Sequence, residues 1–302
     1  MAKAKIPVIL DTDLGTDIDD TWALAMMLKS PELDVKLVVS DTHDTVYRSR
    51  VIAKLLQVAG RTDIPVGVGI SQKTNGGGQA AWVEGYRLGD YPGTVRDDGV
   101  QAIIDTIMGS PEPITLICIG PVPNIAAALR TEPAIAGKAR FVGMHGSVAR
   151  GYGDGQPAAA EYNVAEDPVS CRAAFEAPWL QRVITPLDTC GRVRLDGARY
   201  QQVIASTDPI MKAVVDNYRV WAASHKDIDP QTRSTVLYDT VAVHLAFSTR
   251  FLTMKRMGVA VTDKGMTVPD PKGPAIDVAT DWKDLDGYCD YLVKRLLAPV
   301  CR

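Results

Sequence analysis

Residues 6–28 read IPVILDTDLGTDIDDTWALAMML, and this stretch carries the strongest indication of the fold class. The β-branched run Ile6–Leu10 is typical of a buried strand. Apolar residues at helical spacing follow from Thr21 to Leu28, and Asp19 and Asp20 suit the N-terminus of that helix. The stretch therefore predicts a strand that leads through an acidic loop into a helix, which is the start of a β–α unit.

The same alternation continues along the chain. Further strands are expected at 33–39, 64–68, 114–119, 141–144 and 183–187, and helices at 46–59, 124–129, within 195–223 and around 239–247. Strands that alternate with helices need crossover connections. We therefore predict an α/β fold, a mostly parallel central sheet with helices on both faces and an open Rossmann-like core. Residues 1–302 are expected to form a single domain, because no repeat or linker interrupts them.

The composition excludes several classes of protein. The 302 residues are 46% hydrophobic and 23% charged, with a formal net charge of −3, which is typical of a soluble globular protein. The mild acidity argues against nucleic-acid binding. No apolar run reaches the ~18 residues that a membrane-spanning helix needs. Five scattered cysteines without a CxxC pair disfavour a zinc site or disulfides and favour reduced thiols in the cytoplasm.

The loop 11–20 contains five aspartates: Asp11, Asp13, Asp17, Asp19 and Asp20. Ligands of open α/β sheets bind beyond the carboxyl ends of the strands, where this loop should lie. Five neighbouring carboxylates repel one another unless protons or a cation neutralise them. Hard oxygen ligands suit Ca²⁺, or Mg²⁺ with fewer protein ligands. A solvated helix N-terminus would explain Asp19 and Asp20 but explains Asp11 and Asp13 poorly.

Two motif interpretations compete for this loop. An EF-hand would need Gly at its sixth and Glu at its twelfth position, where this chain has Thr16 and Trp22. A strand followed by a DxD pair is also typical of Mg²⁺-dependent phosphatases of the haloacid-dehalogenase type. Asp11 would then be the nucleophile and Asp13 the acid. That interpretation leaves the three later aspartates of the loop unexplained.

Residues 8–24 resemble the N-terminal signature of the inosine-uridine-preferring nucleoside hydrolases, in the branch with two additional residues before the last aspartate pair. Four more segments match that family in order: 43–45 (HDT), 120–124 (GPVPN), 161–168 (EYN followed by DP) and 237–242 (LYDTVA). The resemblance implies hydrolysis of the N-glycosidic bond of ribonucleosides to ribose and base. The transition state would resemble an oxocarbenium ion. The resemblance also implies that the protein assembles as a homodimer or homotetramer.

The resemblance further implies the roles of individual residues. Calcium would be held by Asp13, Asp20, the main-chain oxygen of Ile119 and Asp239, and Asp13 would accept the proton of a calcium-bound water. The nucleoside substrate would be bound by Asp19, Asp44, Met144, Glu161, Asn163 and Asp239. Asp11 would orient the loop rather than touch the metal.

Two Gly-rich segments, 71–95 with Trp82 and 149–160, are expected to be functional loops.

The match departs from the family around the base. Tyr238 stands where many relatives have the histidine that helps protonate the leaving base, so Tyr238 is the candidate acid. His43, His145 and His225 are the other candidates. Gly155 stands where relatives often have a ribose-binding asparagine, which Asp154 or Gln156 would have to replace. These departures leave the preferred base open. They also allow a catalytically silent ribose- or nucleoside-binding protein.

Overall fold

The computed structural model describes residues 4–301, and within them the strands form a sheet in the order β4-β3-β2-β1-β5-β6-β7-β10-β8-β9. In chain order the strands are β1 (Ile6–Thr12), β2 (Leu33–Ser40), β3 (Val66–Gly67), β4 (Val95–Arg96), β5 (Ile114–Cys118), β6 (Ala139–Met144), β7 (Arg182–Thr185), β8 (Leu252–Val261), β9 (Thr267–Pro269) and β10 (Ala275–Trp282). Neighbours from β4 to β10 pair in parallel, whereas β8 pairs antiparallel with both β10 and β9. The predicted mostly parallel sheet is confirmed.

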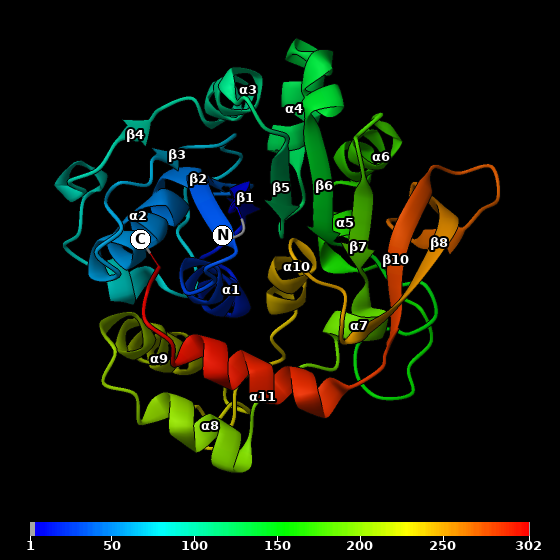
Figure 1. Ribbon diagram of the computed structural model, residues 1–302. Coiled ribbons are helices and arrows are strands. Elements are labelled where there is room, and N and C mark those ends of the chain that lie inside the picture. Colours follow the sequence, from blue (N-terminus) through cyan, green and yellow to red (C-terminus); the bar gives the residue numbers. More distant parts are fainter. Residues whose placement is uncertain (1–3, 302) are drawn as a thin grey trace.

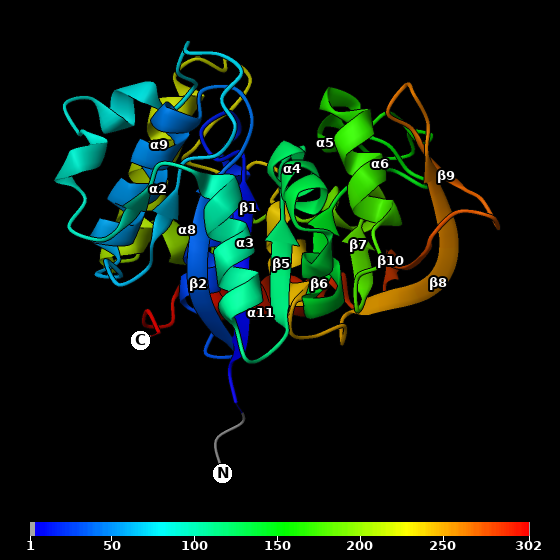
Figure 2. The ribbon, with the colours of Figure 1, turned by 90° about the horizontal axis from the view of Figure 1, so that it is seen from above.

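Helices cover both faces of the sheet, as predicted (Figures 1 and 2). One face carries α3 (Gly99–Gly109), α4 (Pro123–Thr131) and α6 (Pro168–Glu176). The other carries α1 (Asp19–Leu28), α2 (Thr45–Val58), α8 (Gly197–Ile204), α9 (Pro209–Ala222), α10 (Asp239–Leu245) and α11 (Leu285–Leu296). Short elements complete the list: α5 (Tyr162–Glu166), α7 (Leu187–Cys190), and the 3₁₀ turns η1 (Ala80–Val83), η2 (Leu88–Asp90) and η3 (Pro133–Lys138).

The strand β1 shows why the sequence forms two apolar layers. Val8 and Leu10 pack with the layer of α1, whereas Ile9 packs with the layer of α3 and α4. Side chains of a strand point alternately to its two faces, so a strand covered on both sides must be apolar throughout. Each fully buried aliphatic side chain of this kind contributes about 1.5–3 kcal/mol to folding.

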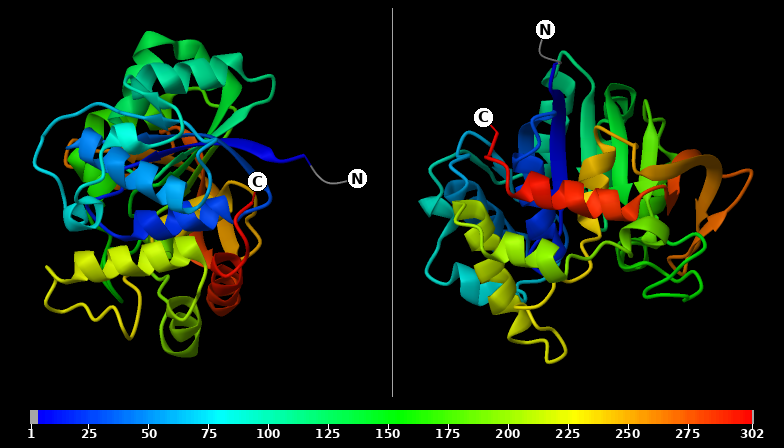
Figure 3. Two further views of the ribbon diagram at one scale, coloured as in Figure 1. Left: turned by 90° about the vertical axis from the view of Figure 1, so that its left-hand side faces the viewer. Right: turned by 60° about the horizontal axis from the view of Figure 1, so that its bottom comes forward.

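Helix α1 lies in the middle of its layer, against α9, α10 and α11 (Figure 3). Every residue from Asp19 to Leu28 is buried. Trp22 lies in the core of this layer, where its ring contacts those of Tyr200 and Tyr218. Because apolar neighbours surround α1, the two aspartates at its first turn are held in a fixed and buried position.

Residues 252–282 were not expected to contain strands, yet they form β8, β9 and β10. The strand β8 is partly exposed along most of its length, in contrast to the buried parallel strands. The last strand in the chain, β10, inserts between β7 and β8. No helix within residues 4–301 combines the length and apolarity needed to cross a membrane.

The carboxyl ends of β1, β2 and β5 are held together tightly. Ile119 N–H donates to the Asp11 carbonyl at 2.9 Å, and Asp41 N–H donates to the Thr12 carbonyl at 2.7 Å. A Cβ at Gly120 would lie 2.9 Å from Asp41 Oδ2 and 3.0 Å from Asp13 N, so only glycine fits there. This close approach brings the loops after the three strands to one place at the edge of the sheet.

Candidate active site

A pocket of about 140 Å³ opens where these loops meet. It is lined by Asp13, Thr16, Asp17, Asp19, Asp20, Ile119, Met144, Tyr152, Glu161, Tyr162, Asn163, Tyr238 and Asp239. Nine of the ten residues predicted to form the site are in this set, although they come from segments far apart in the sequence. The exception is Asp44. Neither Tyr152 nor Tyr162 was predicted.

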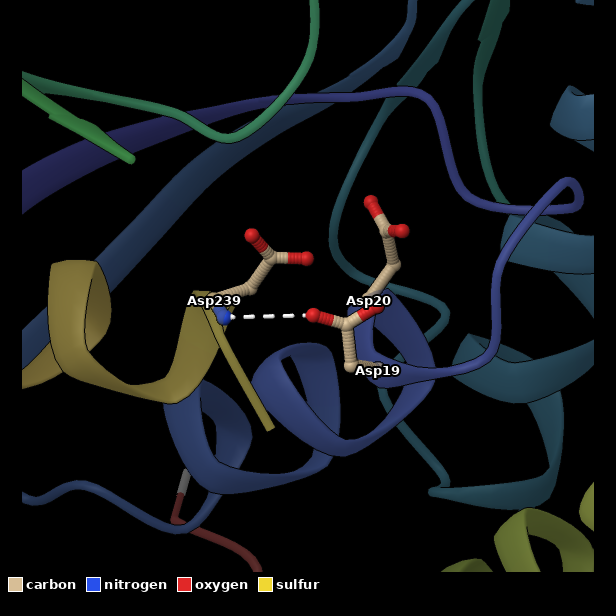
Figure 4. Close-up of side chains that lie close together, drawn as sticks. All are labelled: Asp19, Asp20 and Asp239. Atoms are coloured by element: carbon tan, nitrogen blue, oxygen red, sulfur yellow. Dashed lines mark hydrogen bonds between the residues drawn. The ribbon is translucent and has the colours of Figure 1, made fainter. Parts of the chain in front are cut away.

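Three carboxylates meet on one side of the pocket (Figure 4). Asp19 and Asp20 are the first residues of α1, and Asp239 is the first residue of α10. One oxygen from each of them lies within 4.8 Å of the other two. The backbone N–H of Asp239 donates to Asp19 Oδ2 at 3.3 Å, and the Thr12 hydroxyl donates to Asp20. The starts of two packed helices therefore place three buried carboxylates together.

This cluster is electrostatically strained. Burial raises the pKa of Asp19, Asp20 and Asp239 well above the ordinary value, and the negative charges of neighbouring aspartates raise the pKa of each further. A cation would remove the repulsion and favour the charged form of each group. The donors are all oxygens, the ligand type that hard divalent cations such as Ca²⁺ prefer. The three residues therefore fit a divalent cation.

Asp13 and Ile119 line the same pocket but lie outside this group of three. Arg48 Nη1 lies 3.8 Å from Asp13 Oδ2, and Arg48 Nη2 donates to the Thr16 hydroxyl at 2.7 Å. Burial raises the pKa of Asp13 to about 6, even though the charge of Arg48 lowers it. A carboxylate with a pKa near neutrality can accept a proton from a reacting group. The predicted metal contacts of Asp13 and Ile119 stay predictions.

Another wall of the pocket is built around Glu161, which caps α5. Glu161 Oε1 accepts from Asn163 N–H at 2.8 Å, and Oε2 accepts from Gly146 N–H at 2.9 Å. Burial raises the pKa of Glu161 to about 7, although these backbone donors lower it. The Asn163 amide donates to the Met144 carbonyl at 3.0 Å. The polar atoms of this wall are thus held in place before any ligand arrives.

Three tyrosines form the aromatic side of the pocket. The backbone N–H of Tyr162 donates to the Tyr152 hydroxyl at 2.8 Å, and the rings of Tyr152 and Tyr238 meet edge to face, 6.3 Å apart. Burial raises the pKa of Tyr238 above that of an ordinary phenol. Tyr162 lies between two predicted site residues and Tyr152 lies in a Gly-rich loop, and both positions were signals that could have identified them.

Asp44 lies outside the pocket lining. Its Oδ1 accepts from Tyr47 N–H at 2.9 Å as the N-cap of α2, and its Oδ2 accepts from Gly76 N–H at 3.0 Å. Gly155, which departs from the family pattern, has a left-handed backbone (φ +71°), and a Cβ there would meet open space. The predicted role of Asp44 in substrate binding stays a prediction.

The three candidate histidines are also absent from the pocket lining. His145 is buried between Phe141 and Phe175, with Nε2 3.0 Å from the Gly120 carbonyl oxygen. His43 Nε2 lies 3.1 Å from a carboxylate oxygen of Glu166. His225 stacks on Trp221 with ring centroids 3.7 Å apart. Among the four candidates for the leaving-group acid, Tyr238 is the one that lines the pocket.

Buried polar side chains support the acidic loop, and one of them, Asp41, was not predicted from the sequence. Asp11 is fully buried and accepts from the Asn124 amide at 2.9 Å. Asp41, also fully buried, accepts from Val122 N–H at 2.8 Å through Oδ2. Burial raises the pKa of Asp11 to about 7. Because Asp11 does not line the pocket, the structure gives no support to its role as a phosphatase nucleophile.

The Gly-rich segment 71–95 is tied to the acidic loop. The Gln79 amide donates to the Asp17 carbonyl at 2.5 Å, and the Asn217 amide of α9 donates to Gln79 Oε1 at 2.6 Å. Trp221 Nε1 donates to the Thr16 carbonyl at 2.8 Å. Trp82 does not line the pocket, and the ammonium group of Lys54 lies 4.4 Å from its ring centroid. Two segments remote in sequence therefore support one side of the pocket.

Comparison with known proteins gives consistent results. The family model for inosine-uridine preferring nucleoside hydrolases matches residues 8–288. A pyrimidine-specific ribonucleoside hydrolase of Salmonella arizonae is 30% identical over 317 residues, which cover 96% of this chain and 98% of the relative.

Solved structures share the fold at lower sequence identity. A plant nucleoside hydrolase superposes with a TM-score of 0.81 at 24% identity, covering 98% of this chain and 100% of its own. A purine-preferring ribonucleoside hydrolase from Gardnerella vaginalis gives 0.77 at 22% identity, with coverages of 96% and 98%.

Proposed function

Since the chain belongs to the inosine-uridine preferring nucleoside hydrolase family and is an N-ribosyl hydrolase, we propose that it cleaves ribonucleosides with the help of one bound Ca²⁺. The observation that carries this proposal is the meeting of Asp19, Asp20 and Asp239, whose buried carboxylates need a counter-charge. Asp13 and the Ile119 carbonyl, in the same pocket, would complete the oxygen ligands.

The protein's own residues account for the rest of the reaction. A divalent cation, when bound, lowers the pKa of a water molecule so that it becomes nucleophilic near neutral pH. The Asp13 carboxylate is the proposed acceptor of a proton from the water that attacks the sugar. As the C1′–N bond weakens, positive charge grows on the sugar ring, and the surrounding carboxylates stabilise that charge.

Binding of the ribose is assigned to the fixed polar walls. Asp19, Glu161, Asn163 and Asp239 present oxygen and amide groups that can pair with sugar hydroxyls, and Met144 supplies an apolar contact. A site built from such groups rejects a ligand without the matching hydroxyls, because its buried polar atoms would then stay unpaired. Tyr238 is the proposed hydrogen-bond donor to the leaving base. Its raised pKa makes it a weaker acid than an imidazole.

The test is a panel of purine and pyrimidine ribonucleosides together with p-nitrophenyl riboside, assayed with Ca²⁺ and after verified removal of the metal. We expect release of base and ribose that chelation abolishes and Ca²⁺ restores. Full rates without metal would refute the calcium proposal. Calorimetric binding of ribose without any turnover would instead indicate a silent nucleoside-binding protein.

Two further parts of the proposal concern the state of the protein. We propose a homodimer or homotetramer in a reducing, cytoplasmic environment. The five cysteines support the environment, since Cys118, Cys171, Cys190, Cys289 and Cys301 are scattered along the sequence without a CxxC pair. Light scattering at micromolar concentration measures the assembly, and a mass of a single 32.6 kDa chain would contradict the oligomer.

A further inference from the structure

The charge of the pocket is one-sided. Six carboxylates line it, those of Asp13, Asp17, Asp19, Asp20, Glu161 and Asp239, and its lining contains no Lys, Arg or His from the described chain 4–301. One divalent cation balances two of these charges, and Arg48 beside Asp13 offsets one more. When the carboxylates are ionised, the pocket therefore stays negative with its metal in place, and it favours ligands that bring positive charge.

The depth of the pocket separates the sugar side from the base side. Asp19, Asp20 and Asp239, at 2–4% exposure, mark the buried part where the sugar is proposed to lie. Thr16 and Asp17 are exposed, and Tyr152 and Tyr162 are 42% and 41% exposed. These four exposed residues form the mouth of the pocket. A base attached to a buried ribose would face this mouth.

The mouth is suited to a cationic ring. Asp17 Oδ1 accepts from Ile18 N–H at 2.7 Å, which fixes the carboxylate and leaves Oδ2 without a hydrogen bond from the described residues. The faces of Tyr152, Tyr162 and Tyr238 are electron-rich surfaces of the kind that attract cations.

The chemistry of the leaving base also favours a cationic substrate. A neutral base leaves with the electron pair of the C1′–N bond and becomes an anion unless an acid protonates it. The part of the chain that the structure describes places no imidazole in the lining, and a phenol is a weak acid at neutral pH, so the available acid is weak here. A developing anion would also be repelled by the carboxylates.

A base that is already cationic avoids both difficulties. When the C1′–N bond of a pyridinium riboside breaks, its electron pair returns to the ring nitrogen, which becomes neutral. The oxygen of water bonds to C1′, and one proton is released. The products are ribose, a neutral pyridine and H⁺, so no proton donor is needed.

We propose that this site hydrolyses N-ribosides of positively charged bases, such as pyridinium or N-alkylated purinium ribosides, in preference to those of neutral bases. The inference rests on the proposed function, because it concerns the substrate of the same pocket. Asp17 and the three tyrosines recognise the charged ring, and the metal-side carboxylates hold the ribose.

The experiment compares kcat/KM for three probes at pH 7 with saturating Ca²⁺: nicotinamide riboside, uridine and p-nitrophenyl riboside. The p-nitrophenyl riboside is the matched neutral probe, because its leaving group also departs without a proton. Each value is divided by the uncatalysed hydrolysis rate of the same probe. We expect the cationic riboside to exceed both neutral probes by about tenfold or more.

The Asp17→Asn variant should lower the ratio of nicotinamide riboside to p-nitrophenyl riboside by about five- to tenfold, the effect of removing one partly screened charge. Asp105→Asn, on the exposed surface of α3, removes the same charge far from the pocket and should not change the ratio. Raising NaCl on the unmodified enzyme should raise KM for the cationic probe only, a readout independent of any variant's folding.

The outcomes separate the two proposals. No turnover of any probe would contradict the proposed hydrolase function itself. Turnover of the neutral probes without a preference for the cationic one, or a ratio insensitive to both Asp17 and salt, would overturn the inference about charge and leave the hydrolase function standing.

Discussion

Replacing Asp239 by asparagine should stabilise the protein without metal, and calcium should cancel or reverse that gain. The substitution keeps the size of the side chain and removes one of three buried charges whose oxygens lie within 4.8 Å of one another. If these groups serve only as a solvated helix start, the two conditions should give the same result. If they hold a cation, calcium should cancel or reverse the advantage of the variant.

The magnitude follows from the geometry. Two unit charges 4.8 Å apart in an effective dielectric of about 20 repel by about 3.5 kcal/mol. Protonation already relieves part of this repulsion, since burial and like charges raise the pKa of Asp239. We therefore expect Asp239→Asn to stabilise the metal-free protein by about 1–3 kcal/mol. With ~2.1 cal/mol/K of unfolding entropy per residue over 302 residues, the melting temperature should rise by about 2–5 °C.

Calcium should act in the other direction. At a free concentration of 100 times Kd, a bound ion stabilises the unmodified protein by about 2.7 kcal/mol, or about 4 °C. The variant lacks one ligand and should gain little from the same calcium. Differential scanning calorimetry of both proteins, in chelator and in calcium, measures all four values, with Asp105→Asn on α3 as the exposed control. An unchanged calcium shift in Asp239→Asn, or a loss of stability in chelator, would refute the reasoning.

Three further predictions concern the same pocket. Asp13→Ala should reduce kcat on p-nitrophenyl riboside by about 10³-fold or more through loss of the proton acceptor; a purified, folded variant of normal activity would exclude that role. Tyr238→Phe should slow nucleosides with poor leaving groups more than p-nitrophenyl riboside, and equal losses on both would show that its hydroxyl is not the donor. In chelator, the stability to urea should fall as pH rises from about 4 to 7, because burial raises the folded-state pKa of Asp11 and Glu161 to about 7. The folded protein then binds more protons than the unfolded chain across that range, and stability that rises with pH would contradict this sign.

Local sequence patterns predicted most of the parallel part of the fold, since β1, β2, β3, β5, β6 and β7 are short apolar runs next to a loop or helix signal. They missed the two-residue strand β4, the short strand β9, and the longer strands β8 and β10, whose side chains are partly exposed and alternate irregularly. Such strands owe their position to pairing with distant partners. The contact of β10 with β7, almost a hundred residues earlier, has no local signature.

In the candidate site, too, local sequence patterns predicted some features, whereas others depend on distant parts of the chain. The aspartates that begin α1 and α10 could be identified, because carboxylates at a strand end or helix start carry a recognisable pattern. The side-chain direction of Asp44 could not, since its bonds to Tyr47 N–H and Gly76 N–H depend on the path of a remote loop. Tyr152 was missed for a similar reason. The start of its loop is fixed by Asp188, whose carboxylate accepts from Val148 and Ala149 N–H groups.

The carboxylate cluster at the starts of α1 and α10 can form only after both helices have been synthesised. Asp19 and Asp20 leave the ribosome before their partner Asp239, which follows 219 residues after Asp20. Until then the carboxylates of Asp19 and Asp20 have no third carboxylate beside them, and a nascent or truncated chain that ends before α10 cannot form the cluster. Under the proposed calcium-dependent function, hydrolytic activity would thus be withheld from polypeptides that lack α10.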